Sequence, residues 1–233
     1  MTRAVIPIAV VLALLACTGD ELNLPSEGDP GSITVLGGNG QSGQVGITLP
    51  ESLVVRVTDG EGRPVEGQQV VFVPTADPTG QLLPDTVSTD ATGRAASRWK
   101  LGIEAGSQQV NARVLGGSNP LAVTFTATAD PAPPDSLAEV GGNNQFGQIG
   151  NELTDSLVVA LLDRYGNPIP GADIQWSAQN GNVSNSVTPT DGNGRAAVAW
   201  TLGFFPGTQQ ATAGYSGAKG SPVTFVAGAT VGP

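Results

Sequence analysis

Apolar and polar side chains alternate with a period of two in several short stretches of this chain. Leu53, Val55 and Val57 share one face of such a stretch, and residues 157–161 repeat the arrangement. Alternation over four to eight residues is typical of a strand with one buried face. The stretches are separated by segments that favour tight turns, namely DGEGRP, DRYGNP, DATG and DGNG. No stretch shows a helical period, so the pattern predicts an all-β chain.

The two halves of the chain are copies of one unit. GGNGQSGQVGITLPESLVVRV at 37–57 matches GGNNQFGQIGNELTDSLVVAL at 141–161, and TDATGRAASRWKLG at 89–102 matches TDGNGRAAVAWTLG at 190–203. A period of roughly 95 residues is far longer than that of a solenoid, so each copy is expected to be a complete domain. Short strands in a unit of this size predict a β-sandwich. The sequence therefore predicts two tandem immunoglobulin-like β-sandwich domains.

The N-terminal segment predicts a lipid anchor. Residues 4–16 form an apolar run after Arg3, too short to span a bilayer but typical of a secretory signal. The run ends at Leu-Leu-Ala-Cys, which resembles a bacterial lipobox with Cys17 as the lipidated residue. This resemblance implies attachment to the membrane through an N-terminal lipid, and Thr18 in the next position implies export to the outer membrane. The alternative is an ordinary signal peptide with a chance cysteine.

These features predict how the chain is divided. The expected parts are a lipoprotein signal peptide with lipobox at 1–17, a flexible tether at 18–31, immunoglobulin-like domain 1 at 32–129, a Pro-rich linker at 130–135 and immunoglobulin-like domain 2 at 136–233. The tether is polar and lacks any hydrophobic period. Prolines 131, 133 and 134 predict a short, semi-rigid linker.

Both copies resemble one known family. The run D-x-x-G-x-P-x-x-G occurs at 59–67 and at 163–171, followed in each copy by T-D-x-x-G-R-A, W-x-L-G and a closing V-T-F. This ordered set resembles the bacterial immunoglobulin-like domain of group 1, which occurs in tandem in the invasin and intimin adhesins of the outer membrane. The resemblance implies an immunoglobulin-like fold and display at the cell surface.

Composition argues against several functional classes. The 233 residues include no His and one Cys, and their formal net charge is −10. An acidic chain lacks the basic face that nucleic-acid binding needs, so no nucleic-acid partner is expected. Without His, no nucleophile–base set can be assembled from the usual groups. We therefore expect no enzymatic activity, no catalytic residue, no metal and no cofactor.

Two motifs could have carried chemistry but have simpler explanations. Ser97 and Lys100 match S-x-x-K, yet on a strand they would point to opposite faces. The DGNG segment that begins at Asp191, like its counterpart at Asp90, resembles the start of a calcium loop. It lacks the distal glutamate that such a loop requires, so turn formation explains both segments.

Two functions remain from the sequence. The first is a lipid-anchored adhesion protein that binds a protein or polysaccharide ligand at the cell surface. The second is a structural spacer or envelope component without specific recognition. The copies diverge where Ser42 becomes Phe146 and where Ile103 and Glu104 become the pair Phe204-Phe205. We expect these three phenylalanines to gather at the end of domain 2 farthest from the anchor, as a partner-binding tip. The alternative is that they cap the core.

Overall fold

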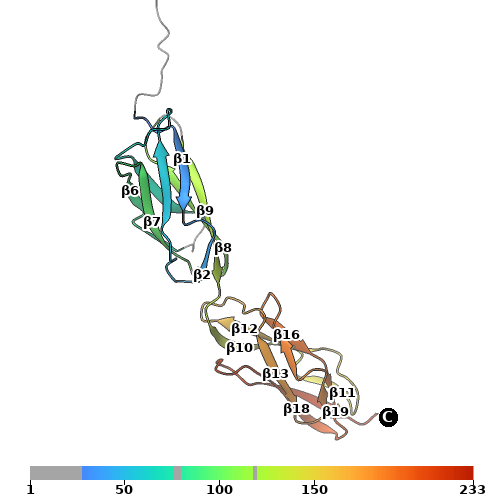
Figure 1. The fold of residues 1–233 in the computed structure, drawn as a ribbon. Helices are drawn as coiled ribbons and strands as arrows, with labels where there is room; N and C mark the ends of the chain where they lie inside the picture. Colours follow the sequence, from blue (N-terminus) through green and yellow to red (C-terminus); the bar gives the residue numbers. More distant parts are fainter. Residues whose placement is uncertain (1–27, 76–79, 118–119, 233) are drawn as a thin grey trace, which may run out of the picture.

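A computed structural model describes residues 28–75, 80–117 and 120–232. Within these ranges the chain forms two β domains, one after the other (Figure 1). Cys17, the signal segment and residues 18–27 of the tether lie outside the described residues. In the described part of the chain no helix is long and apolar enough to cross a membrane.

Domain 1 is a sandwich of two sheets. Its described strands are β1 (Ser32–Gly37), β2 (Gln41–Gln44), β3 (Leu53–Thr58), β4 (Gln69–Pro74), β5 (Gln81–Leu83), β6 (Thr86–Ser88), β7 (Arg94–Lys100), β8 (Gly106–Val114) and β9 (Ala122–Asp130). One sheet has the order β1-β3-β7-β5 and the other β2-β9-β8-β4-β6. The inward residues of both sheets form one core, which includes the fully buried Trp99, Phe72 and Phe125.

Domain 2 repeats this plan. Its described strands are β10 (Pro134–Gly141), β11 (Gln145–Gln148), β12 (Leu157–Asp163), β13 (Asp173–Ala178), β14 (Asn182–Val183), β15 (Val187–Pro189), β16 (Arg195–Val198), β17 (Trp200–Thr201), β18 (Gly207–Gly214) and β19 (Val223–Thr230). The sheets are β10-β12-β16 and β11-β19-β18-β13-β15, with a β14-β17 pair beside them. A second, separate core surrounds Trp200 and Phe225.

The alternation in the sequence matches the burial of the strands. Leu53, Val55 and Val57 are fully buried, and Leu157, Val159 and Leu161 are their buried counterparts. The stretch that corresponds to β7 is divided in domain 2 into β16, which pairs with β12, and β17, which pairs with β14. The prediction of two immunoglobulin-like β-sandwiches is confirmed.

A glycine in each domain lets the chain pass from one sheet to the other. β1 pairs with β3, whereas the next strand, β2, lies parallel to β9 in the opposite sheet. Gly38 lies between them with a φ of 80°, and a Cβ built there would lie 2.2 Å from the carbonyl oxygen of Ser52. Only glycine fits so close an approach in this conformation. Gly142 occupies the same position in domain 2.

The two domains follow each other closely. β9 ends at Asp130 and β10 begins at Pro134, so three residues separate the last strand of domain 1 from the first of domain 2. Ala132 in this segment is buried and belongs to the core of domain 1. The connection is therefore packed against protein over part of its length.

Candidate functional site

Four aspartates fix the turns in which the family resemblance was found. In each turn one carboxylate oxygen accepts the backbone N–H groups of the second and fourth residues that follow. These aspartates are Asp59, Asp90, Asp163 and Asp191. The third following residue is a glycine with positive φ, as the turn geometry requires. Asp90 and Asp191 therefore have a structural role as turn-forming residues.

The turn that begins at Asp163 also holds the two domains together. Its other carboxylate oxygen accepts the N–H of Ala132 at 2.8 Å and the side-chain amide of Asn167 at 2.8 Å. The Asn167 amide in turn accepts the N–H of Ala105 at 2.9 Å and donates to the carbonyl oxygen of Ile103 at 2.8 Å. Asp163 and Asn167 are 3% and 9% exposed. The turn thus binds both the connecting segment and the 102–105 loop of domain 1.

Hydrogen bonding keeps the Asp163 carboxyl ionised in this turn. Burial by itself raises its pKa, but the hydrogen bonds from Asn167, Ala132 and Tyr165 outweigh that effect. The pKa of Asp163 is therefore lowered from its ordinary value of 3.8. The carboxylate form is the one that accepts these four hydrogen bonds.

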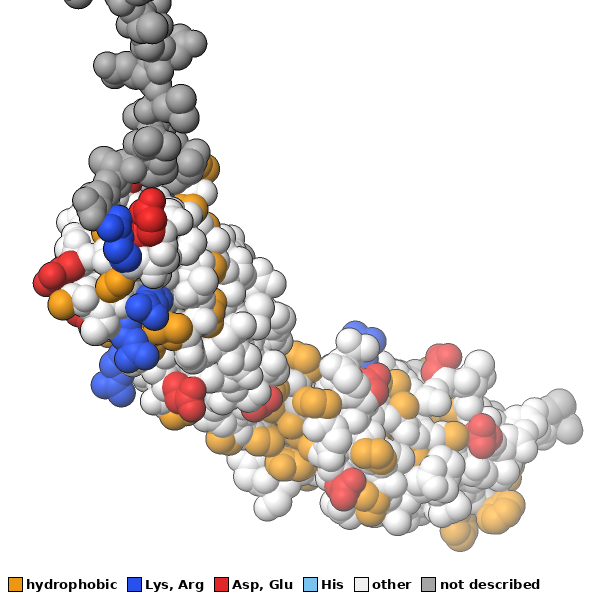
Figure 2. All heavy atoms as spheres, turned by 45° about the horizontal axis from the view of Figure 1, so that its top comes forward, with side chains coloured by type: hydrophobic (Ala, Val, Ile, Leu, Met, Phe, Trp, Pro, Cys, Tyr) orange, Lys and Arg blue, Asp and Glu red, His pale blue; other side chains and the backbone are white. Residues whose placement is uncertain are grey.

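The equivalent loop of domain 2 contacts no other domain in the described part of the chain. Residues 203–206 correspond to 102–105, and they lie at the opposite end of domain 2 from the connection (Figure 1). Phe204 and Phe205 are 79% and 75% exposed, whereas Ile103 is 44% exposed. Hydrophobic side chains project at this far end in the space-filling view (Figure 2). This loop therefore exposes two aromatic rings where its counterpart contacts another domain.

The 203–206 loop could not form the hydrogen bonds by which the 102–105 loop of domain 1 binds the domain that follows it. Pro206 replaces Ala105 and has no N–H to donate to an asparagine side chain. The ring of Phe204 lies beside Gly150, since a Cβ built on that glycine would be 2.9 Å from the ring. In domain 1 the counterpart, Gly46, faces the hydroxyl of Tyr165 from domain 2, at 3.4 Å from a Cβ built there. In domain 2, Phe204 thus lies where Tyr165 of the neighbouring domain lies in domain 1.

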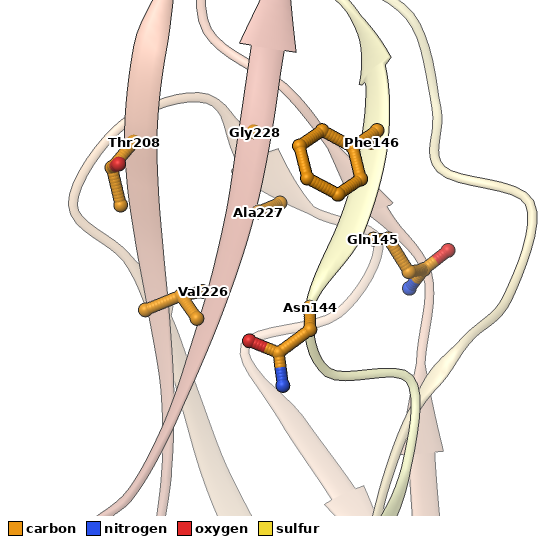
Figure 3. Close-up of a pocket in the computed structure, with 7 residues that line it drawn as sticks. All are labelled: Asn144, Gln145, Phe146, Thr208, Val226, Ala227 and Gly228. Atoms are coloured by element: carbon orange, nitrogen blue, oxygen red, sulfur yellow. The ribbon is translucent and has the colours of Figure 1, made fainter.

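Phe146 lies on a neighbouring surface of the same domain. It extends outward from β11 and is 83% exposed. A shallow hollow lies beside it, lined by residues of β11, β18 and β19 (Figure 3). Its ring covers Gly228 of β19, where a Cβ would come within 2.6 Å of two ring atoms. An aromatic ring that covers a strand glycine also protects the exposed backbone.

The three phenylalanines line two separate hollows of domain 2. Phe204 and Phe205 line a pocket together with Gly150 and residues 179–182, whereas Phe146 lines the separate hollow on β11 and β19. In the described part of the chain no ring-to-ring contact joins the three. None of these side chains is buried in the core of domain 2.

The contact between the domains was not evident from the sequence. Asn167 and Asp163 belong to the family-like turn, and they were interpreted only as turn formers. The signal was the difference between the copies, because DRYGNP in domain 2 replaces DGEGRP in domain 1. In domain 1 the equivalent Arg63 bonds to Asp59 of its own turn, at 2.8 Å. The Ser97 hydroxyl, finally, is buried and donates to the carbonyl of Pro84, while Lys100 is exposed.

Known structures resemble this fold at low sequence identity, and no protein-family model matches the chain. The D0–D1 domain of intimin is 17% identical over 85% of this chain and 95% of that one, with a TM-score of 0.33. The Yersinia pseudotuberculosis adhesin InvE is 21% identical over 88% and 61%, with a TM-score of 0.40. Domains 1–6 of the surface-layer protein SbsC are 15% identical over 88% and 28%, with a TM-score of 0.40.

The chain thus spans 61% of the InvE structure and 28% of the SbsC structure. At these identities the similarity concerns the fold alone and says nothing about a ligand. In fold, the chain is similar to immunoglobulin-like domains of bacterial surface proteins.

Proposed function

We propose that this chain is a lipid-anchored cell-surface protein that binds a partner through the far end of domain 2. The observation that carries the proposal is the exposure of Phe204 and Phe205 on a loop whose counterpart in domain 1 contacts another domain. Exposed aromatic rings bury a large apolar area at small entropic cost when a partner covers them. Such rings in neighbouring positions are typical of interaction surfaces.

The chemistry of this end fits a protein or polysaccharide ligand. The two loop phenylalanines are flanked by the polar Gln179, Asn180 and Asn182. Flat rings with amide groups around them suit a partner that has apolar patches and hydrogen-bonding groups. Phe146 adds a further exposed ring on the adjoining surface. The proposal assigns no catalytic role to any residue.

The anchor in this proposal rests on the sequence. Cys17 would carry the lipid, and the tether at 18–31 would connect it to domain 1. The 203–206 loop, which would form the partner-binding end, lies at the other end of domain 2 from the connection to domain 1 (Figure 1). Attachment at one end and binding at the other would hold the contact away from the outer membrane.

The alternative is a spacer that gives reach without recognition. The hydrogen bonds that Asp163 and Asn167 form with the preceding residues fix the connection between the domains. A fixed connection is useful to a spacer and to a partner-binding protein alike, so it does not separate the two functions. The exposed phenylalanines favour binding, because a spacer has no need of them.

Adherence of the bacterium decides between the two functions. A strain that lacks the gene is compared with the parent strain on epithelial cell monolayers and on polysaccharide-coated plates. Under the binding function the deletion strain adheres less, and the wild-type gene restores adherence. Equal adherence of the two strains on every surface would contradict the proposal.

The anchor is tested separately by membrane fractionation. In a strain that produces Cys17→Ala, the protein should leave the outer-membrane fraction, because no residue remains to carry the lipid. Full retention of the variant in that fraction would disprove the role of Cys17.

A further inference from the structure

The outer face of one sheet of domain 1 is basic, although the whole protein is acidic. Arg56 on β3 and Arg94, Arg98 and Lys100 on β7 all point away from the core, as the alternating burial of these strands shows. Figure 2 shows Lys and Arg side chains gathered in a file down one face of domain 1. Strands β1, β3, β5 and β7 contain no Asp or Glu. The chain as a whole has twenty acidic and ten basic residues.

Among residues 28–75, 80–117 and 120–232, none forms an ion pair with any of these four cations. The Asp90 carboxylate lies near Arg94, and the Arg94 charge helps to lower the pKa of Asp90. Arg56 and Arg94 are direct cross-strand partners, and like charges in that position repel each other. Asp90 precedes Arg94 in the turn and accepts its backbone N–H. The Asp90 carboxylate thus offsets part of the Arg94 charge, whereas no described carboxylate forms an ion pair with Arg56.

One donor of Arg56 is unpaired in the described part of this face. The Nε atom of Arg56 is buried and has no hydrogen-bond partner among the described residues. A buried donor of a charged group that stays unpaired costs free energy. An anionic group bound at the surface over Arg56 and Arg94 would neutralise both charges and would lie close to that buried donor. Guanidinium groups favour sulfate, phosphate and carboxylate in this way.

The arrangement fits a chain of negative charges. Arg94, Arg98 and Lys100 follow one strand, and from the first to the last they span about 20 Å at roughly 3.3 Å per residue. A single file of this length matches a linear polyanion better than a planar lipid surface, which would require basic groups across a wider face. In domain 1 the aromatic residues Trp99, Phe72 and Phe125 are all buried. The described part of domain 1 thus supplies no exposed ring of its own to stack on nucleic-acid bases, and the ring near the file is Tyr165 of domain 2, beside Lys100.

We infer that this face of domain 1, the basic file (Arg56, Arg94, Arg98 and Lys100), binds a linear acidic polysaccharide. The site is specific to domain 1. In domain 2 the counterparts of Arg56, Arg98 and Lys100 are Ala160, Ala199 and Thr201. Arg195, the counterpart of Arg94, lies in a sheet whose β10 contains Asp135 and Glu139. The inference is independent of the partner-binding end of domain 2.

Binding of defined polysaccharides to the full chain tests this inference. The chain carries Cys17→Ser so that it stays free of lipid, and the probes are dextran sulfate, polygalacturonate and uncharged dextran at about 50 mM NaCl. We expect both acidic polymers to bind and dextran not to bind. Affinity should fall steeply as salt rises, because counter-ions compete for the same groups.

Two triple variants separate a specific site from a general charge effect. R94Q/R98Q/K100Q should lower the affinity by about tenfold or more, since it removes three contacts of the file. The control R113Q/R195Q/K219Q removes the same number of positive charges elsewhere and should change it by no more than about twofold. Both sets of side chains point outward, so the unfolding temperatures should stay close to that of the parent chain. NMR supplies a readout at the site, because the Hε–Nε signal of Arg56 should shift when dextran sulfate is added.

Several results would overturn the inference. The acidic polymers could fail to bind the parent chain, or the two triple variants could lose affinity equally. Single-stranded DNA or vesicles of phosphatidylglycerol could bind more tightly than the polysaccharides, with the same dependence on the basic file. Such an outcome would assign the site to nucleic acid or to a lipid surface instead.

Discussion

Residues 102–105 of domain 1 and 203–206 of domain 2 occupy the same place in the repeat but have different surroundings. The first loop gives its backbone groups to Asn167 of the next domain. The second has a proline where the first has its N–H donor, and two exposed phenylalanines beside it. The two domains have matching cores and differ in a few loop residues. In domain 1 this loop forms a connection to the next domain, whereas in domain 2 it forms an exposed apolar surface.

The turns opposite these loops differ in the same way. In domain 1 Arg63 bonds to Asp59 within its own turn. In domain 2 the shorter, uncharged Asn167 bonds to Asp163 and leaves two groups to bind the preceding domain. The Asn167 side chain therefore serves both its own turn and the preceding domain, because its amide has a donor and an acceptor beyond the bond to Asp163.

The largest effect is expected from the two buried tryptophans. Trp200→Ala should destabilise domain 2 by about 3–5 kcal/mol, because it removes a fully buried aromatic side chain. Trp99→Ala should do the same to domain 1. Urea unfolding followed by the amide NMR signals of each domain measures both. Since the two cores are separate, each substitution should spare the other domain, and joint unfolding of both domains would contradict this.

A smaller effect is expected at the connection between the domains. Asn167→Ala removes the partners of the Ala105 N–H and the Ile103 carbonyl, and it should lower stability by about 1–2 kcal/mol. It should also let the domains reorient independently, which nitrogen-15 relaxation detects as different tumbling times. Arg63→Ala is the matched control, because Arg63 has the equivalent position and bonds to Asp59 and Glu61 of its own turn. The connection would be assigned wrongly if both variants changed the tumbling equally.

Much of the fold could be predicted from the sequence. The alternation of apolar residues and the composition of the turns were enough to predict the two sandwiches. Both the buried face of a strand and the position of a tight turn depend on the residue types in the local sequence. The repeat also identified the loop that differs between the copies. Asn167 was not found, since a short polar residue in a turn satisfies its own backbone in most settings. Its contact with domain 1 depends on how the domains are arranged, which the local pattern does not encode.

The basic file was missed for a different reason. Net charge averages over the whole chain, and the acidic total concealed four cations on one sheet. Arg94, Arg98 and Lys100 are separated by inward-facing residues in the sequence. Arg56 lies far away in sequence and joins them only through the pairing of β3 with β7. Three of the four, Arg94, Arg98 and Lys100, are outward positions of one predicted strand and could have been grouped from the sequence.

The smallest effect is expected from pH. The pKa of Asp163 lies below its ordinary value of 3.8 in the folded protein. Its contribution to stability is therefore complete above about pH 4 and is lost only as the pH falls through the lowered pKa. The tumbling times and the amide shift of Ala132 should stay unchanged from about pH 8 to pH 5. A transition of the Ala132 shift within that range would contradict the hydrogen bonding described for Asp163.

Adherence of bacteria that display an altered end of domain 2 is the most direct test of the difference between the two copies. The variant F146S/F204I/F205E gives domain 2 the residues of domain 1 at all three positions. At equal surface amounts and with unchanged unfolding temperature, adherence should fall to the level of the deletion strain, because the exposed aromatic rings are gone. Adherence equal to that of the wild type would contradict the binding role of this end.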